Sequence, residues 1–461
     1  MKICFLVPDG VGLRNYLYSS LIDKFPEDAE ILLLTVLPRE VLDEVEKIHN
    51  RKFSYVAMTA YNEAFKGKLL KEAITYARLR YNTRKMRNDT IMINWTRKHY
   101  SFARGLFYKA AACIGWLFSF SYKGILSLER AYEKHVHSTA YFREQQEMLR
   151  NNKPDIIFST HQRSLDGSVI IEAAKSLGIK TVGAVYSWDN LPKARLLVRT
   201  ENYVVWSEYM KQEMADYYPE VDPAKVLITG TPQFEFYFNK ELYMSREEFF
   251  SNVGLDPDRK VLCFSGNDLT FPCDHLYLDD LCDALMKMPE KDRPQVLLRR
   301  SPVDLTGRYE PVVRKYPELI KVSDPLWKSY SREWSFTVPT MDDVKLLVNV
   351  ALHSDAVINV GSTMAHDFAV YGKPAIYINY DQPSVTHWSA ITNNRFQHFR
   401  SMPSDDCVIW LNSRAGIEEC VREALYGQSN PKGDAWFRVV ALHPVQEASQ
   451  RIASTIMALV S

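Results

Sequence analysis

The chain has 461 residues, of which 46% are hydrophobic and 25% charged, with a formal net charge of +1. This length and composition predict a globular protein of two domains, and the balanced charge argues against a nucleic-acid partner, because wrapping phosphates needs a sustained excess of Lys and Arg. The seven cysteines are scattered and never spaced as CxxC, which indicates reduced thiols in a cytoplasmic protein.

In the first half of the chain, apolar runs of strand length alternate with segments of helical period. This alternation is typical of a parallel sheet with crossover helices. After Gly230-Thr231-Pro232 the alternation pauses in an aromatic-rich stretch, so we place the end of a first domain, residues 1–240, there. Its predicted strands are 3–7, 31–37, 156–159, 181–185, 203–206 and 226–229.

Residues 51–150 interrupt this pattern and predict a helical insert in the first domain. Residues 51–153 contain 20 Lys and Arg against seven Asp and Glu, and the apolar stretch 105–122 is rich in aromatics and interrupted by Lys109. Two interpretations stand side by side: helices packed on the sheet with a solvated basic face, or a surface that docks on anionic lipid.

A second alternating series follows a short helix, for which Ser245 and Glu248 form a capping box and Gly254 an end signal. It predicts a second domain, residues 241–461, and two α/β units in tandem indicate a cleft between them. The last helical stretch, 444–460, is compatible with packing on either domain. The predicted strands of this series are 261–265, 296–299, 356–360 and 375–378.

The sharpest motif is Asn359 to Pro374, NVGSTMAHDFAVYGKP, which reads as a strand, a small-residue turn and a helix. Gly361 lets the backbone approach a ligand closely, and a helix that begins at Ser362 or Thr363 offers unpaired N–H groups to a phosphate. Asp367 follows one turn later, far enough along to reach a ribose hydroxyl; a solvated first-turn acid is the structural alternative.

This segment resembles the nucleotide-binding element of GT-B glycosyltransferases, in which the turn binds the donor phosphates and an acid at the position of Asp367, more commonly Glu, contacts the ribose. Residues 296–302 are similar to the segment that reads Arg-Pro-His-Pro in the bacterial surface-polysaccharide branch, although the His is absent. Arg299 or Arg300 is therefore a candidate for neutralising a diphosphate, with a surface salt bridge as the alternative.

The resemblance implies an α/β fold of two Rossmann-like domains facing a cleft, with the basic helical insert in the N-terminal one. The loop at Gly266 and Asn267, after the first strand of the second domain, is then expected to cover the nucleotide sugar, and a plain turn is the alternative. The related CDP-glycerol glycerophosphotransferase-like enzymes share this architecture.

Polar side chains also follow three strands of the first domain, where open parallel sheets collect their ligands. Asp9, His161 and Asp189 are the candidate catalytic residues, and Asp166 lies close to His161 in the sequence. A first-domain acid or His161 is expected to act as the general base: Asp9 is a candidate in the loop that faces the acceptor in the resembled fold, and His161 is the candidate whose side chain ordinarily titrates near neutral pH. A capping or turn role is the alternative for each of these residues.

The resemblance implies a metal-independent glycosyltransferase that moves a sugar from a nucleotide-sugar donor to a glycan or lipid-linked acceptor in surface-polysaccharide assembly. No cofactor or metal is expected, since the only DxD-type pair, Asp256 and Asp258, lies in a proline-fixed turn. The lipid-docking interpretation of the insert predicts peripheral contact with the inner face of the cell membrane. The alternatives are a CDP-polyol phosphotransferase, a nucleotide-sugar epimerase or hydrolase, and a non-catalytic membrane scaffold.

Overall fold

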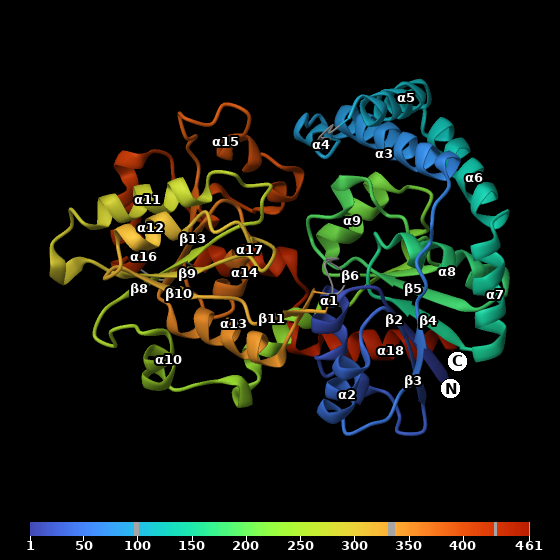
Figure 1. Cartoon of the computed structure of the whole chain (residues 1–461), viewed down its shortest axis with the longest axis horizontal. Helices are drawn as coiled ribbons and strands as arrows, with labels where there is room; N and C mark the ends of the chain where they lie inside the picture. The colour runs from blue at the N-terminus through green and yellow to red at the C-terminus, as the bar shows by residue number, and fades with distance from the viewer. Residues whose placement is uncertain (96–100, 331–336, 428–430, 461) are drawn as a thin grey trace. The chain divides into compact units, whose positions relative to one another are not determined.

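The computed structural model describes residues 1–95, 101–330, 337–427 and 431–460 (Figure 1). Its contacts divide the chain into two compact units. We call them the N-terminal unit, made of Met1–Gln233, Ser329–Val338 and Val440–Ser461, and the C-terminal unit, made of Phe234–Lys328 and Pro339–Val439.

The N-terminal unit is built on a parallel sheet of seven strands in the order β3-β2-β1-β4-β5-β6-β7. The central strands are buried on both faces, which is why they read as continuous apolar runs in the sequence. All six predicted strands of this series are present. The strands are β1 (Lys2–Val7), β2 (Glu30–Thr35), β3 (Ser54–Ala57), β4 (Ile156–Ser159), β5 (Lys180–Ala184), β6 (Asn202–Val205) and β7 (Val226–Ile228).

Helices cover this sheet, and the last helix of the chain is one of them. The final helix α18 (Ala448–Val460) contacts β4 and β5, and its buried residues include Ile452 and Ile456. The stretch that the sequence left open between two domains therefore belongs to the N-terminal unit, although it follows the whole C-terminal unit in the chain. The other helices are α1 (Gly10–Gly12), α2 (Arg39–Ile48), α8 (Leu165–Ser176) and α9 (Glu208–Tyr217).

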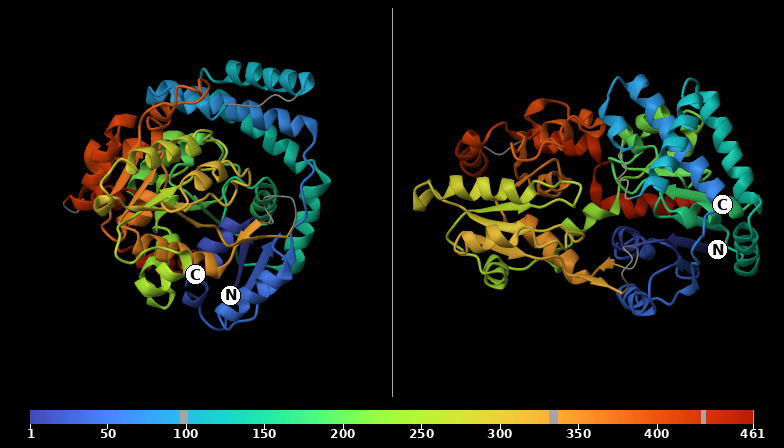
Figure 2. Two further views of the ribbon diagram at one scale, coloured as in Figure 1. Left: turned by 60° about the vertical axis from the view of Figure 1, so that its left-hand side comes forward. Right: turned by 45° about the horizontal axis from the view of Figure 1, so that its top comes forward.

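From Phe65 on, the predicted insert is helical and forms one side of the N-terminal unit (Figures 1 and 2), whereas its first part contains β3, a strand of the sheet. Its long helix α3 packs against α5 and α6. Arg78 of α3 is buried and pairs with Glu129 at 2.7 Å and with Glu220 at 2.8 Å, so part of the basic charge is structural. The helices are α3 (Phe65–Met86), α4 (Thr90–Ile93), α5 (Phe102–Phe118), α6 (Tyr122–His137) and α7 (Ala140–Asn152).

The C-terminal unit has a parallel sheet in the order β10-β9-β8-β13-β14-β15, which includes all four predicted strands. Ser245 caps the predicted short helix: the Glu248 amide donates to Ser245 Oγ at 3.1 Å, and the helix ends at Gly254 with a φ of 73°. The strands are β8 (Val261–Ser265), β9 (Gln295–Arg299), β10 (Ile320–Ser323), β13 (Ala356–Asn359), β14 (Ala375–Ile378) and β15 (Ile409–Leu411).

Helices flank this second sheet, and its apolar core lies between them and the strands. The helices are α10 (Arg246–Val253), α11 (Asp274–Leu285), α12 (Glu310–Lys315), α13 (Met341–His353), α14 (Met364–Ala369), α15 (Ala390–Asn393), α16 (Ile417–Tyr426) and α17 (Pro431–Val440). A short pair of strands, β11 (Trp327–Ser329) and β12 (Thr337–Pro339), forms a separate sheet. The chain thus has the predicted α/β class with two parallel sheets.

Candidate active site

In the N-terminal unit, the sheet brings Asp9 and His161 together. Asp9 follows β1 and His161 follows β4, and these two strands are neighbours in the sheet. Asp9 Oδ2 is hydrogen-bonded to His161 Nδ1. Tyr186, after the next strand β5, packs its ring edge against the imidazole with centroids 4.3 Å apart. Three residues far apart in the sequence therefore form one cluster at the carboxyl edge of the sheet.

Asp9 is held firmly in this cluster. Its Oδ1 accepts hydrogen bonds from the amides of Val11 at 3.0 Å and Gly12 at 3.1 Å, and Gly12 packs so closely that an added Cβ would lie 2.4 Å from Thr160 Oγ1. Burial opposes the negative charge of Asp9, yet His161 and the two amides together hold the pKa of this carboxyl below its ordinary value. Both oxygens are engaged in these contacts, which fix the Asp9 carboxylate against His161, and a role of Asp9 as the base stays a prediction.

The other imidazole nitrogen of His161 is unpaired among the described residues. Because the Asp9 carboxylate accepts a hydrogen bond from the Nδ1–H group, a neutral His161 carries its lone pair on Nε2. This Nε2 is buried and has no hydrogen-bond partner among the described residues. An imidazole held by a carboxylate on one nitrogen, with the other nitrogen unpaired, is the arrangement of a general base.

Asp189, the third predicted catalytic residue, is occupied by other groups. Ser187 Oγ donates to its Oδ1 at 2.6 Å, and Lys193 forms an ion pair with its Oδ2. Asp189 lies close enough to Tyr186 to help, after burial, in raising the pKa of that phenol. Asp189 thus borders the cluster, but its charge is compensated within its own turn. Asp166 accepts a hydrogen bond from the Tyr61 amide at 2.6 Å and so holds the loop between β3 and α3.

The sequence interpretation missed Glu213, on α9. Both of its carboxyl oxygens are buried without a partner among the described residues, and burial, followed by the charges of Asp189 and Asp216, raises its pKa well above the ordinary value. A signal was present: Met210, Met214 and Glu213 share the buried face of α9 by helical spacing, and an acid on such a face is unusual.

In the C-terminal unit, the turn after β13 has the close approach that its glycine predicts. Gly361 has a φ of 64°, and an added Cβ there would lie 2.7 Å from Phe399 Cζ and 2.9 Å from Asn393 Nδ2. Both the backbone conformation and the lack of space require glycine. The structure therefore packs the turn tightly against the segment 390–399.

The helix after this turn starts later than the sequence indicates. The Ser362 amide donates to Asn359 Oδ1 at 2.7 Å, and the Met364 amide approaches Ser362 Oγ at 3.4 Å. These side chains close the turn, so α14 begins at Met364, with Thr363 as its N-cap residue. Part of the predicted phosphate cradle is thus satisfied by the protein itself, and phosphate binding at Ser362 and Thr363 stays a prediction.

Asp367 lies in α14 and is 9% exposed, so it is not the solvated acid of the structural alternative. Its charge contributes, after burial, to raising the pKa of Tyr377, whose hydroxyl donates to the Ser362 carbonyl at 2.9 Å. Asp367 therefore lies close to the turn and to the sheet below it. Contact with a ribose stays a prediction for this residue.

Arg299 and Arg300 each have carboxylate partners in the structure, and diphosphate binding by either one stays a prediction. Arg299 is buried and pairs with Asp343 at 2.6 Å; Asp343 also accepts from the Trp327 indole N–H at 2.8 Å. Arg300 is partly exposed and pairs with Glu310 at 2.9 Å and with Asp324. Removing one partner of a buried ion pair leaves an uncompensated charge and is strongly destabilising, so the Arg299–Asp343 pair contributes to the structure of this unit.

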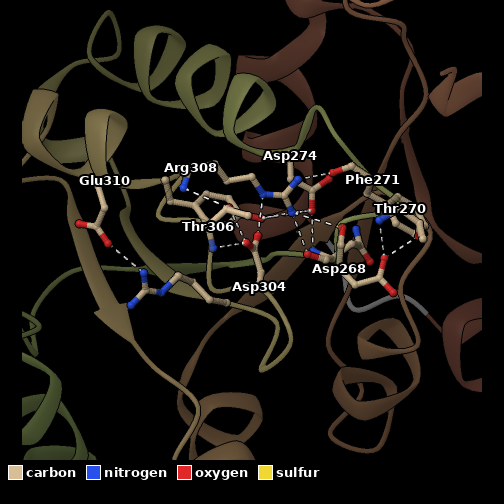
Figure 3. Close-up of polar contacts among 11 residues, drawn as sticks. Asp268, Thr270, Phe271, Asp274, Asp304, Thr306, Arg308 and Glu310 are labelled. Carbon is tan, nitrogen blue, oxygen red and sulfur yellow. Dashed lines mark hydrogen bonds and ion pairs between the residues drawn. The ribbon is translucent and has the colours of Figure 1, made fainter. Parts of the chain in front are cut away.

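The loop at Gly266 and Asn267 is fixed by a cation that the sequence interpretation missed, Arg308 (Figure 3). Arg308 Nη2 donates to the Asn267 carbonyl at 2.9 Å, and its Nε donates to Asp304 at 2.6 Å. An added Cβ at Gly266 would lie 2.4 Å from the Tyr309 hydroxyl. Because β8 and β13 are neighbours, this loop and the Gly361 turn stand at adjacent strand ends.

Asp274 anchors the same loop from the start of α11. It accepts a hydrogen bond from the Asn267 amide, while its Oδ1 and Asn267 Nδ2 are buried without partners among the described residues. Burial raises the pKa of Asp274 to about 7, against the pull of Asn267 and Arg308. An unmatched acceptor and an unmatched donor at one strand end are groups that a polar ligand can satisfy.

We expect Asp274→Asn to change how stability depends on pH. The folded-state pKa of Asp274 is raised from 3.8 to about 7, so between these values the folded state binds more protons than the unfolded chain, and the free energy of unfolding falls as pH rises. At about 1.4 kcal/mol per pKa unit, this contribution is up to about 4 kcal/mol. Asparagine does not titrate, so the free energy of unfolding of the variant, measured with urea, should rise relative to that of the wild type as pH rises. Parallel stability curves would contradict the assignment.

The described residues contain one group with the spacing of metal ligands, Glu133, His137 and Glu172. It lies on α6 and α8, and Glu172 already pairs with Lys175 at 2.8 Å. None of the predicted catalytic or nucleotide-binding residues belongs to this group. The candidate site is therefore assembled without it.

Comparison with known proteins identifies the fold. No family model and no curated protein sequence matches the chain. Among solved structures, UDP-GlcNAc 2-epimerase from Neisseria meningitidis bound to UDP-GlcNAc is similar with a TM-score of 0.51 at 10% identity, over 99% of this chain and 100% of that one. A glycosyltransferase from Rickettsia africae gives a TM-score of 0.53 at 11% identity, over 99% and 98%.

A third structure, Anabaena Alr3699/HepE in complex with UDP and glucose, has a TM-score of 0.50 at 11% identity, over 99% of this chain and all of that one. These likenesses extend over the whole length of both chains. They establish the two-domain GT-B fold for this protein, with a Rossmann-like sheet in each unit. At this level of identity they show the fold alone.

Proposed function

We propose that this protein is an enzyme that acts on a nucleotide-activated sugar. The observation that carries the proposal is the hydrogen-bonded Asp9–His161 pair at adjacent strand ends. The second ring nitrogen of His161, Nε2, has no hydrogen-bond partner among the described residues. The GT-B fold supports it, because the Neisseria epimerase is bound to UDP-GlcNAc and the Anabaena protein is in complex with UDP and glucose.

The reaction that this pair fits best is sugar transfer to a hydroxyl group. His161 Nε2 takes the proton of the acceptor hydroxyl while the oxygen attacks the anomeric carbon of the donor, and Asp9 stabilises the imidazolium that forms. The bond between the anomeric carbon and the phosphate oxygen breaks, and the nucleoside diphosphate leaves with the electron pair.

In this proposal the C-terminal unit holds the donor. The Gly361 turn and the loop at Asn267 stand at adjacent strand ends, where nucleotides bind in open α/β sheets. Asp367 is the ribose candidate beside the turn, and Arg308, not Arg299, is the cation that hydrogen-bonds to the Asn267 loop. The acceptor, a glycan or a lipid-linked sugar, belongs to the N-terminal unit, where His161 lies.

A second candidate is epimerisation or hydrolysis of the nucleotide sugar without an acceptor. Several of the similar solved structures are UDP-GlcNAc 2-epimerases, so the comparisons support this candidate better than sugar transfer, CDP-polyol phosphate transfer or a non-catalytic scaffold. His161 would then act on a proton of the sugar or of water.

Product analysis separates these reactions. A thermal-shift panel of UDP, GDP, CMP, CDP and dTDP sugars first identifies the donor, since a ligand that binds only the folded state raises Tm. We then expect nucleoside diphosphate to accumulate only after a glycan or lipid-linked acceptor is added. An epimer or free sugar formed from the donor alone would assign the second candidate. The absence of any nucleotide binding would overturn the proposal that the chain acts on nucleotide sugars.

A further inference from the structure

Helix α5 of the N-terminal unit exposes a row of large apolar side chains. Phe102 is 89% exposed, Leu106 61% and Leu117 59%, and Trp116 is also exposed. The positions 102, 106, 109, 113, 116 and 117 recur at helical spacing, so they form one stripe along the helix. Within this stripe Lys109 is the one charged residue.

The opposite face of α5 is apolar as well, and it is the face that packs. Ala111 and Gly115 are its buried residues, and an added Cβ at Gly115 would lie 2.6 Å from the Ala73 carbonyl of α3. Figures 1 and 2 show α5 lying along the outer side of α3. The stripe is thus not the side by which the helix joins its own unit. One apolar face of α5 is covered by α3, whereas the exposed stripe still lacks an apolar surface to pack against, as is typical of a binding face.

The charge around this stripe has one sign. From Thr90 to Leu128 the sequence contains five Lys and Arg and no Asp or Glu. Lys109 lies within the stripe, and Arg104 and Lys123 are exposed close to its two ends. A second copy of this helix would bring like charges together. An anionic lipid surface offers opposite charge to the cations and an apolar layer to the aromatic side chains.

The length of α5 excludes a spanning role. No helix among the described residues is both long enough and apolar enough to cross a bilayer. With 17 residues and a rise of about 1.5 Å per residue, α5 is about 26 Å long, which is short of a typical hydrocarbon core of about 30 Å. A helix of this kind lies in the plane of the membrane interface.

We propose that α5 docks this protein peripherally on a membrane that contains anionic phospholipid, with Phe102, Leu106 and Leu117 inserted and the cations at the headgroups. Docking would place the enzyme near lipid-linked acceptors. It stands independently of the proposed reaction, because lipid binding is measured without turnover. The ligand class is an anionic bilayer surface, recognised by insertion and charge together.

Flotation of the full-length protein with vesicles tests this proposal. We expect binding to phosphatidylcholine vesicles that contain phosphatidylglycerol and much weaker binding to phosphatidylcholine alone. The double variant Leu106→Glu, Leu117→Glu should lower the partition coefficient about tenfold or more, because it removes inserted side chains and adds negative charge. Lys109→Ala should lower it about fivefold, and high salt should act in the same direction.

The double variant Met286→Glu, Leu305→Glu is the matched control, since it places the same two new charges at exposed apolar sites of the C-terminal unit, where Met286 is 47% and Leu305 90% exposed. It should bind vesicles like the wild type. Equal binding by the wild type and the α5 double variant would overturn the proposal. So would light scattering that shows a dimer which the double variant abolishes, because the stripe would then be a self-association surface.

Discussion

His161→Ala is expected to lower the rate of sugar transfer by about 10² to 10⁴, the usual contribution of a general base, while donor affinity stays close to that of the wild type. The physical reason is that Nε2 of His161 carries the proton-accepting lone pair, which the hydrogen bond to Asp9 orients. Neither nearby acid can replace it. Asp189 is ion-paired with Lys193, and burial favours the protonated form of Glu213 by raising its pKa. Initial rates with a saturating donor and the Kd of the donor measure the two effects separately.

Asp9→Asn tests the same pair from the other side. The amide oxygen can still accept the hydrogen bonds from Val11 and Gly12, so the turn should keep its shape. The amide N–H₂ group, however, favours the imidazole tautomer with the proton on Nε2, which cannot accept one there. We expect a rate loss of about 10² or more with an unchanged Tm. His137→Ala, at an exposed histidine, is the control. A fully active His161→Ala enzyme would remove His161 from the mechanism.

The second large effect is expected from Asp343→Ala, which should destabilise the fold by about 3–5 kcal/mol, because it leaves the Arg299 guanidinium buried without its partner. Asp324→Ala is the matched comparison: it removes a carboxylate from the neighbouring Arg300, which is partly exposed, and an exposed pair contributes about 0–1 kcal/mol. Urea unfolding of the two variants beside the wild type gives both values.

The same pair of variants decides between two roles for Arg299. If Arg299 is structural, Asp343→Ala lowers the unfolding midpoint strongly, and any loss of donor affinity follows from that instability. If both variants unfold like the wild type while Asp343→Ala alone changes the donor Kd, Arg299 is a phosphate ligand and its pairing with Asp343 belongs to the ligand-free state. The buried network of Arg299, Asp343 and Trp327 favours the first outcome.

The secondary structure was predictable where strands are buried on both faces. Strands such as β1, β4 and β8 have only apolar environments around them, so their sequences are continuous apolar runs. The edge strand β3 was missed because it is largely exposed and carries no such signal. Strand β10, at the edge of the second sheet, is half-buried and was missed for a similar reason.

Local patterns in the chain were sufficient to predict the α/β class and the two sheets. They also predicted the close backbone packing at Gly361 and the placement of Asp9 and His161 after strands. Which of these residues meet depended on the packing of the folded chain. Asp9 and His161 are 152 positions apart, and they pair because β1 and β4 are neighbours, an order that no local pattern encodes. For the same reason no local pattern predicts that Arg299 pairs with Asp343, 44 positions away, or that α18 packs on the sheet of the N-terminal unit. Strand order and burial are properties of the whole packed chain.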